Sequence, residues 1–290
     1  MAWPVFAHVA RGCPQPRAGL PWLALTLLLA VPAAARGAPE EPAGLPLRGP
    51  EAEAFLKTAR VVLKEPLGVG ITHSDRLTLE DGAKKARAIW KTINEHKQGL
   101  QKLANGGSEF DFRDSYKAEV AAYELDKLLG LDLVPATAER RIDGRVGSLQ
   151  FWVESAITQL ERKQKGIEPP DLDLWNQQMH KVRLLHQLTY NTDHQNIRNV
   201  LLDPSFRVYA VDSSRAFHVQ VELLQPGDLV RFSRRVVARM EALDKATLKE
   251  HLGPWLGGMQ IDGLIARRNK ILAIIKQRVA EKGEAEVFFP

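Results

Sequence analysis

A cluster of polar side chains followed at once by two apolar runs constrains this chain more than any other feature. It occupies residues 188–217, LTYNTDHQNIRNVLLDPSFRVYAVDSSRAF. The apolar runs, 200–202 and 208–211, are joined by Asp203-Pro204-Ser205-Phe206, and Asp and Pro favour a turn, so the runs predict a β-hairpin. Antiparallel pairing would bring the polar entrance of this hairpin close to Asp212 at its exit. Oxygen ligands held in this way suit Mg²⁺ or Mn²⁺, the cations that bridge phosphates.

The same arrangement of side chains is what phosphoryl transfer requires. In such enzymes one Asp orients the attacking hydroxyl, while an Asn and a later Asp hold the metal. The segments Asn191-Thr192-Asp193, Asn199-Val200-Leu201-Leu202 and Val211-Asp212 resemble the catalytic loop and the metal-binding Asp of atypical kinases. The relatives in question are the phosphatidylinositol 3-/4-kinase-like group, the HipA-type kinases and the secreted Golgi casein-kinase-like enzymes.

This resemblance implies a role for each polar residue of the cluster. Asp193 would be the catalytic acid that orients or deprotonates the acceptor hydroxyl, and Asn199 and Asp212 would bind Mg²⁺ or Mn²⁺. One departure concerns spacing, because kinases place the Asn five residues after the Asp and Asn199 stands six after Asp193. Either one residue is inserted in the loop or Asn196 shares the metal role.

The N-terminus has the composition of an export signal. Arg11 and Arg17 precede an apolar run over 20–35 that closes on three alanines, so residues 1–37 are predicted to be a secretory signal peptide. The run is short for a membrane span, which needs about 20 residues, although a retained signal anchor is an alternative. Residues 38–50, rich in Pro, Gly and Ala, predict a flexible linker. We expect a secreted or periplasmic protein with no membrane span after cleavage.

Cleavage would also change the chemistry of the chain. The only cysteine, Cys13, lies inside the signal, so the mature chain would have neither a disulfide nor a reactive thiol. The formal net charge is +5, and cleavage near Ala35, which removes Arg11 and Arg17, leaves +3. That charge is too small to indicate a nucleic-acid partner. We expect a monomer that stabilises its fold through its core.

The first half of the mature chain is predicted to be rich in strands. A helix is expected over 51–63, and antiparallel strands over 76–79, 85–93, 136–142 and 146–153. The turn with Gly68 and Gly70 could cover phosphates, since glycine lets backbone N–H groups approach an anion. Residues 95–111 are polar and predict a loop with a marginal helical turn.

Two residues of this half match the lysine–glutamate pair of kinases. Lys91 ends a strand-like run and would hold the ATP phosphates. Asp114-Ser115 predicts the start of a helix that ends at Gly130, and Glu119 on that helix would hold Lys91, with Glu124 as the alternative. Lys91, Glu119, Asp193 and Asp212 follow one another in the order that the resemblance implies.

The boundary between two lobes is expected near residue 155. The strand 147–153 ends at Glu154, where adenine would meet backbone groups of the hinge, so the small lobe is 51–155 and the large, mainly helical lobe is 156–290. Asp171 or Asp173 is expected to cap a long helix that enters the polar cluster. Further helices are predicted after Asp228, over 246–252 and after Asp262.

These observations together predict an α+β, two-lobed, protein-kinase-like fold: an antiparallel-sheet lobe followed by a mainly helical lobe. The expected activity is ATP-dependent phosphotransfer, with Mg²⁺ or Mn²⁺, onto a hydroxyl of a protein, a lipid headgroup or a sugar. Two alternatives remain open at this point. One is a kinase-shaped nucleotide-binding protein without turnover, and the other is an AMP-transferring enzyme on the same fold.

Overall fold

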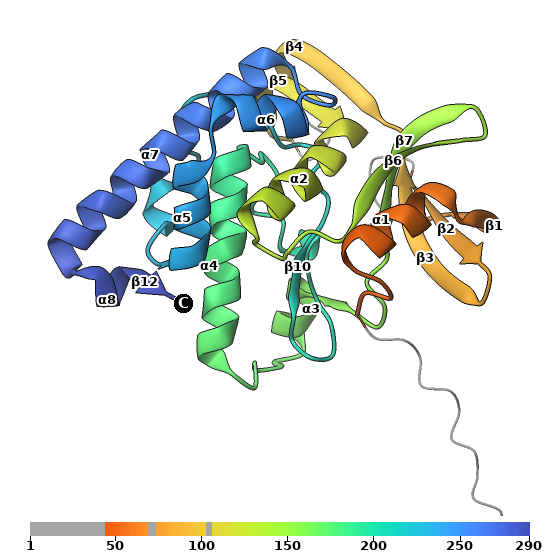
Figure 1. The fold of residues 1–290 in the computed structure, drawn as a ribbon, viewed down its shortest axis with the longest axis horizontal. Coiled ribbons are helices and arrows are strands. Elements are labelled where there is room, and N and C mark those ends of the chain that lie inside the picture. Colours follow the sequence, from red (N-terminus) through yellow and green to blue (C-terminus); the bar gives the residue numbers. More distant parts are fainter. Residues whose placement is uncertain (1–43, 69–73, 103–105) are drawn as a thin grey trace, which may run out of the picture. The chain divides into compact units, whose positions relative to one another are not determined.

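A five-stranded antiparallel sheet forms the first lobe. The computed structural model describes residues 44–68, 74–102 and 106–290. The strands follow the order β1 (Arg60–Pro66), β2 (Ser74–Asp81), β3 (Lys84–Lys91), β7 (Arg145–Phe151) and β6 (Thr137–Ile142) (Figure 1). The two residues that join β6 to β7, Asp143 and Gly144, have φ of 50° and 77°, as a two-residue hairpin turn requires. The predicted strands at 76–79, 136–142 and 146–153 are therefore present.

The helix that precedes the sheet ends earlier than the sequence predicts. Helix α1 (Gly49–Thr58) packs Phe55 on Phe151, with ring centroids 5.8 Å apart. The predicted helix over 51–63 was too long, because the run Val61-Val62-Leu63 is recruited into β1, and β-branched residues favour a pleated surface. The end of the predicted linker is also ordered, since Gly44 and Glu154 exchange two backbone hydrogen bonds of 2.9 Å.

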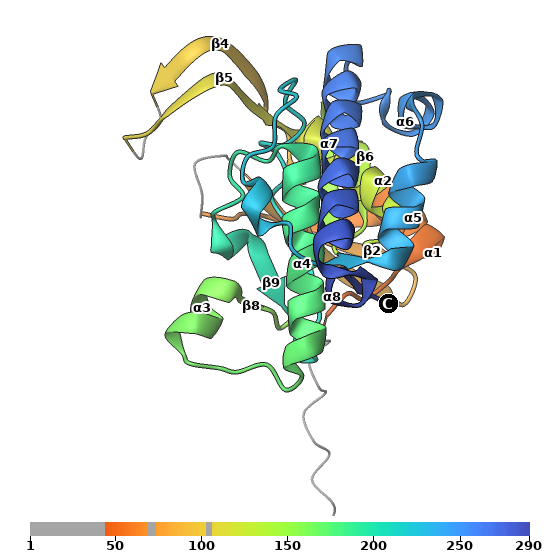
Figure 2. The same ribbon diagram turned by 90° about the vertical axis from the view of Figure 1, so that its left-hand side faces the viewer.

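A two-stranded hairpin separates β3 from the first long helix. Strands β4 (Asn94–Lys102) and β5 (Ser108–Ser115) pair with each other alone and project away from the helices (Figure 2). The prediction of a polar loop with a helical turn over 95–111 was wrong. Strand β4 carries a single apolar side chain, Leu100, so the alternation that marks a half-buried strand is missing there, and in β5 it is limited to Phe110 and Phe112.

Helix α2 (Tyr116–Leu129) begins and ends where the sequence predicts. The Ser115 hydroxyl accepts the Lys117 N–H at 3.2 Å, and Gly130 ends the helix with φ of 63°. The helix packs on β6 and β7 with small buried residues, among them Ala118, Ala121 and Ala122. Small side chains let the helix approach the sheet closely.

The second lobe is mainly helical, as predicted. Helix α4 (Leu172–Thr189) is capped by Asp171, whose carboxylate accepts the Leu174 N–H at 2.9 Å. The predicted hairpin forms β9 (Val200–Leu202) and β10 (Val208–Ala210), and β8 (Ile157–Thr158) adds a third strand. The connector between the lobes also contains α3 (Gln159–Gln164), whose Thr158 and Glu161 form a reciprocal cap.

The C-terminal part adds the remaining elements of the helical lobe. They are η2 (Pro226–Asp228), β11 (Phe232–Ser233), α5 (Arg234–Ala242), α6 (Lys245–Leu252), α7 (Gly258–Lys282), α8 (Glu284–Val287) and β12 (Phe288–Phe289). Asp228 does not cap a helix, because β11 pairs with β12 and holds the chain extended up to Ser233. Asp262 lies inside α7 rather than at its start. Within the described ranges no helix has the length and apolar character needed to cross a membrane.

Candidate active site

Lys91 forms ion pairs with Glu119 of its own lobe and with Asp212 of the other lobe. It stands at the end of β3, and its Nζ lies 2.6 Å from Glu119 Oε1 and 2.6 Å from Asp212 Oδ1. The Lys91 side chain is 12% exposed and that of Glu119 2%, so little water screens this pair. Of the two candidate glutamates on α2, Glu119 is the one that contacts Lys91.

Glu119 also reaches the segment that follows Asp212. Its second oxygen, Oε2, accepts the backbone N–H of Ser213 at 2.9 Å. Glu124, the alternative partner, lies farther along α2 and pairs with Lys127 at 3.0 Å. One side chain of α2 therefore fixes both the lysine of β3 and the backbone next to Asp212.

The pKa values of these groups follow from burial and from their mutual charges. Burial alone would lower the pKa of Lys91, but Glu119 and Asp212 outweigh it and raise this pKa above its usual value, so Lys91 stays charged. Burial would raise the pKa of Asp212, and the Lys91 ammonium outweighs that effect and lowers it. For Glu119, burial wins and raises the pKa, with Lys91 offsetting part of the rise.

The polar cluster after α4 folds back onto Asp193. The side-chain amides of Asn196 and Asn199 donate to Asp193 Oδ2 at 3.0 and 2.8 Å. A short 3₁₀ turn, η1 (Ile197–Asn199), takes up the extra residue between Asp193 and Asn199. The six-residue spacing is thus compatible with a direct contact between the Asp and the Asn.

The β9–β10 hairpin brings this cluster to Asp212. The Val211 N–H donates to the Asn199 carbonyl at 2.9 Å, at the open end of the hairpin. The Thr192 N–H donates to the Arg215 carbonyl at 3.2 Å, so the chain on either side of Asp193 and Asp212 is held together. Asp212 itself adopts φ of 59°, an uncommon conformation for a residue with a side chain, and Ser214 Oγ donates to its Oδ1 at 3.2 Å.

The two asparagines differ in what their amide oxygens do. Asn196 Oδ1 accepts the Arg198 N–H at 3.3 Å and thereby caps η1. Asn199 donates through Nδ2 to Asp193, and its Oδ1 has no hydrogen-bond partner within the described part of the chain. That stretch also contains no group of three or more His, Cys, Asp or Glu side chains arranged to hold a metal. A site made of one Asp and one Asn amide, completed by phosphate oxygens, does not need such a group.

The predicted nucleotide-binding residues lie around the sheet. Gly68, with φ of 65°, follows β1 in the connection to β2, and Gly70 lies outside the described residues. Glu154 follows β7, as predicted for a hinge residue. Its backbone N–H and C=O are both bonded to Gly44, and its carboxylate accepts Arg87 Nε at 2.9 Å. The backbone and the carboxylate of Glu154 are therefore both engaged within this chain.

The structure adds residues that sequence reasoning missed. Asp114, expected only as a helix cap, ends β5 with a buried carboxylate near Lys91 and Asp212. Burial raises the pKa of Asp114, and the charge of Asp212 adds to that rise. Glu109, in the hairpin predicted as a loop, accepts the Thr192 hydroxyl at 2.8 Å. Its separation from Thr192 by 83 positions gives no local sequence signal.

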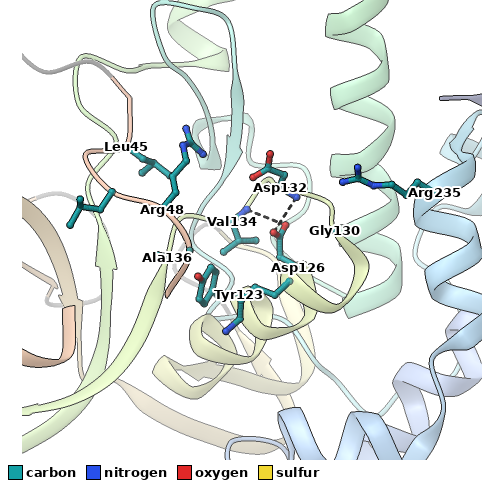
Figure 3. A pocket seen from close by; sticks show the side chains of 12 residues that line it. Leu45, Arg48, Tyr123, Asp126, Gly130, Asp132, Val134, Ala136 and Arg235 are labelled. Atoms are coloured by element: carbon teal, nitrogen blue, oxygen red, sulfur yellow. Dashed lines mark hydrogen bonds between the residues drawn. The ribbon is translucent and has the colours of Figure 1, made fainter. Parts of the chain in front are cut away.

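A separate cavity lies at the C-terminal end of α2. It has a volume of about 240 Å³, and Arg48, Tyr123, Asp126 and Arg235 are among the residues around it (Figure 3). Asp126 accepts the backbone N–H groups of three residues after the helix, at 3.0 to 3.2 Å, and burial raises its pKa to about 6. None of the predicted site residues lines this cavity, so it is distinct from the Lys91 centre.

Solved structures of atypical kinases are similar to this chain. A hydra Fam20 structure with sugar has a TM-score of 0.61 at 13% identity, covering 82% of this chain and 90% of its own. The Golgi casein kinase has a TM-score of 0.58 at 14% identity, covering 82% of this chain and 78% of its own, and a further structure of it has Mn and ADP bound. Neither a protein-family model nor a curated protein sequence matches the chain. At these identities the likeness shows the fold, and the predicted two-lobed, atypical-kinase-like α+β fold is confirmed.

Proposed function

We propose that this protein is a metal-dependent phosphotransferase that moves the γ-phosphoryl group of ATP to a hydroxyl. The observation that carries the proposal is the bridge from Lys91 to Glu119 and Asp212, with both Nζ–oxygen distances at 2.6 Å. The same centre has Asp193 held by Asn199 at 2.8 Å. A buried lysine, its glutamate and two separate acids are what phosphate binding, metal binding and hydroxyl activation each require.

Each residue of the centre has a role that follows from its position. Lys91, kept charged by its two carboxylates, would bind the α- and β-phosphate oxygens. Glu119 would hold Lys91 in place and, through the Ser213 N–H, the backbone beside Asp212. Asp193 would orient the acceptor hydroxyl and accept its proton, while the amides of Asn196 and Asn199 keep its carboxylate fixed.

The donor set around Asp212 fits Mg²⁺ or Mn²⁺. These ions prefer carboxylate and amide oxygens, and Asp212 with Oδ1 of Asn199 supplies one of each. Asn199 is the better amide, because the oxygen of Asn196 already caps η1. When held by Asp212 and Asn199, the ion would neutralise the negative charge that develops on the phosphates. The Golgi casein kinase has been solved with Mn and ADP bound, which supports this choice of ion.

The nucleotide would lie between the sheet and the β9–β10 hairpin. Gly68, in the β1–β2 connection, would cover the phosphates, since glycine exposes its backbone N–H groups. Both backbone groups of Glu154 already bond Gly44, so adenine would meet the chain beside Glu154 rather than Glu154 itself. Binding of a nucleotide analogue to Gly68→Pro, compared with wild type, tests this placement.

The proposed location of the protein is outside the cytoplasm. The N-terminal sequence predicts a signal peptide, and a Golgi enzyme is among the similar structures. Sequencing the N-terminus of the protein recovered from an exporting host tests the expectation, which is overturned if residues 1–37 are retained in a soluble intracellular form.

Label transfer tests the proposed reaction. The full chain is incubated with Mn²⁺, a Ser-rich acidic protein, and ATP labelled at either the γ or the α position, beside Asp212→Ala. Label from the γ position that is lost in the variant supports phosphotransfer. Label from the α position identifies AMP transfer instead, and nucleotide binding without any label identifies a binding protein without turnover. Repeating the γ-label assay with a sugar and with a phosphoinositide as acceptors distinguishes the three classes of hydroxyl.

A further inference from the structure

Glu109 connects the β4–β5 hairpin of one lobe to the catalytic loop of the other. The Thr192 hydroxyl donates to Glu109 Oε1 at 2.8 Å, and the Arg215 guanidinium forms an ion pair with Glu109 Oε2. The Glu109 side chain is 10% exposed and that of Arg215 21%. Strand β4 is mostly exposed to solvent, whereas β5, which carries Glu109, is mostly half-buried.

The two residues that Glu109 holds flank the catalytic centre. Thr192 precedes Asp193 directly, and Arg215 stands three residues after Asp212. They already pair through the backbone, since the Thr192 N–H donates to the Arg215 carbonyl at 3.2 Å. Glu109 therefore binds both members of this backbone pair. The pair in turn sets the separation between the catalytic Asp193 and the metal-binding Asp212.

The shape of the hairpin directs Glu109 to this place. The register of β4 and β5 shifts between Lys97 and Leu100, and Asp111, opposite this shift, has φ of 60°. The carboxylate of Asp111 is bound by His96 at 2.6 Å and Arg113 at 3.0 Å, which stabilises the irregular backbone. Such a bulge bends a ribbon and redirects its side chains. Next to it, Arg215 lies over the Phe112 ring at 5.2 Å from the centroid.

We infer that Glu109 is a positioning residue for the phosphotransferase centre. It acts through Thr192 and Arg215 and touches neither the nucleotide nor the metal ligands. The predicted effect on turnover rests on the proposed function. The predicted effect on the structure of the catalytic loop does not. Because the contact crosses between lobes, the hairpin holds the catalytic loop in the one arrangement that faces Lys91.

The variant Glu109→Gln tests the inference in the full chain. Gln keeps the size and can still accept the Thr192 hydroxyl, but it loses the ion pair with Arg215. Hydrogen exchange of residues 190–194 and 213–216 is expected to be about ten- to a hundred-fold faster, since a largely buried ion pair is lost. Turnover is expected to fall by about 10- to 100-fold, with the KM for ATP and the affinity for Mn²⁺ little changed, because a misplaced catalytic group slows the chemical step.

Two further variants separate positioning from general instability. Glu95→Gln is the matched control, because Glu95 is on the same hairpin and pairs only with Lys97 among the ion pairs of the described residues. It should change neither exchange nor turnover. Thr192→Val removes the other half of the contact, which Glu109→Gln retains, and it should also speed the exchange of residues 190–194.

The outcomes distinguish this inference from the proposed function. Unchanged exchange at 190–194 in Glu109→Gln overturns the inference, whatever the wild type catalyses. Faster exchange with unchanged turnover of an active wild type overturns it as well. If the wild type transfers no label at all, the proposed function fails, and the exchange comparison still decides whether Glu109 fixes the loop.

Discussion

The ammonium of Lys91 and the carboxylate of Glu119 lie 2.6 Å apart, although they come from a strand and a helix 28 positions apart in the chain. Both side chains are largely buried, so each depends on the other for compensation of its charge. The β4–β5 hairpin lies between the two residues in the sequence, yet their side chains are in contact. The stability of the fold and the proposed chemistry therefore both depend on the Lys91–Glu119 ion pair.

Removing the lysine should therefore weaken the fold as well as nucleotide binding. Lys91→Met is expected to lower the free energy of unfolding by about 3–5 kcal/mol, because it leaves Glu119 buried without its partner. The double variant Lys91→Met with Glu119→Gln should regain part of this loss but no label transfer. Urea unfolding and the γ-label assay measure the two effects. Lys85→Met, whose lysine is exposed beside Glu80, should change neither, and an equal loss there would contradict the prediction.

The two asparagines of the catalytic loop should differ in their effect on the metal. Asn199→Ala is expected to weaken Mn²⁺ binding in the presence of ADP by about tenfold or more, because it removes a direct ligand. Asn196→Ala should weaken it less, since its oxygen is engaged with the Arg198 N–H. Calorimetric titration measures both, with the exposed Asn269→Ala as control. A larger loss for Asn196→Ala would assign the ligand to that residue instead.

Gly147 should tolerate no side chain, because β7 passes too close to the end of β3. A Cβ at Gly147 would lie 2.2 Å from the Lys91 carbonyl oxygen and 2.9 Å from Trp90 Nε1. Gly147→Ala is expected to destabilise the fold by at least about 1–3 kcal/mol and to weaken nucleotide binding, because the strand that carries Lys91 must move. Gly227→Ala is the control, since its Cβ would meet nothing within 4 Å. Equal melting temperatures for the two variants would refute the prediction.

His218 should make the protein less stable as the pH falls from about 6.5 to 4. Burial, followed by the charges of Arg113 and Arg215, lowers the pKa of this fully buried imidazole to about 4, with Asp111 opposing. Between these pH values the unfolded chain binds a proton that the folded chain does not. The stability contribution is therefore complete above 6.5 and is lost by up to about 3 kcal/mol as the pH approaches 4.

The variant His218→Phe isolates this effect. Phe keeps an aromatic ring against Tyr190, whose ring centroid lies 5.7 Å away, and it does not titrate. Urea unfolding of both proteins across the window gives a difference curve in which Asp126, common to both, cancels. The wild type should lose stability more steeply with acid than the variant. Parallel curves would show that His218 is protonated in the folded protein, through Glu109 at 3.7 Å.

Arg267 should be essential for the helical lobe although no role in the proposed chemistry is assigned to it. It is fully buried on α7 and donates to the carbonyls of Leu188 at 2.8 Å and His218 at 3.0 Å, and also to Gln220. Arg267→Met is expected to cost about 3–5 kcal/mol of stability, because these buried carbonyls lose their donors. Its half-buried neighbour supplies the comparison, as Arg268→Met should change the melting temperature little. Similar losses for both would rule out this role.

The sequence by itself determined the elements whose hydrogen bonds close within a few residues. Ser115 and Gly130 delimit α2, Asp171 starts α4, and Asp143-Gly144 forms a hairpin turn, because caps and turns depend on short-range contacts. The order of Lys91, Glu119, Asp193 and Asp212, and the resemblance that it carries, were also visible. The two-lobed fold followed from them.

Only the tertiary structure decided which groups meet across long separations. It selected Glu119 over Glu124, left the Asn199 oxygen free of the capping role that Asn196 performs, and turned the stretch 94–115 into a hairpin that reaches Thr192. It also kept the chain extended past Asp228, through pairing of β11 with β12. These contacts join residues that are distant in the chain, and no local pattern records them, because their free energy arises only when the distant segments pack together.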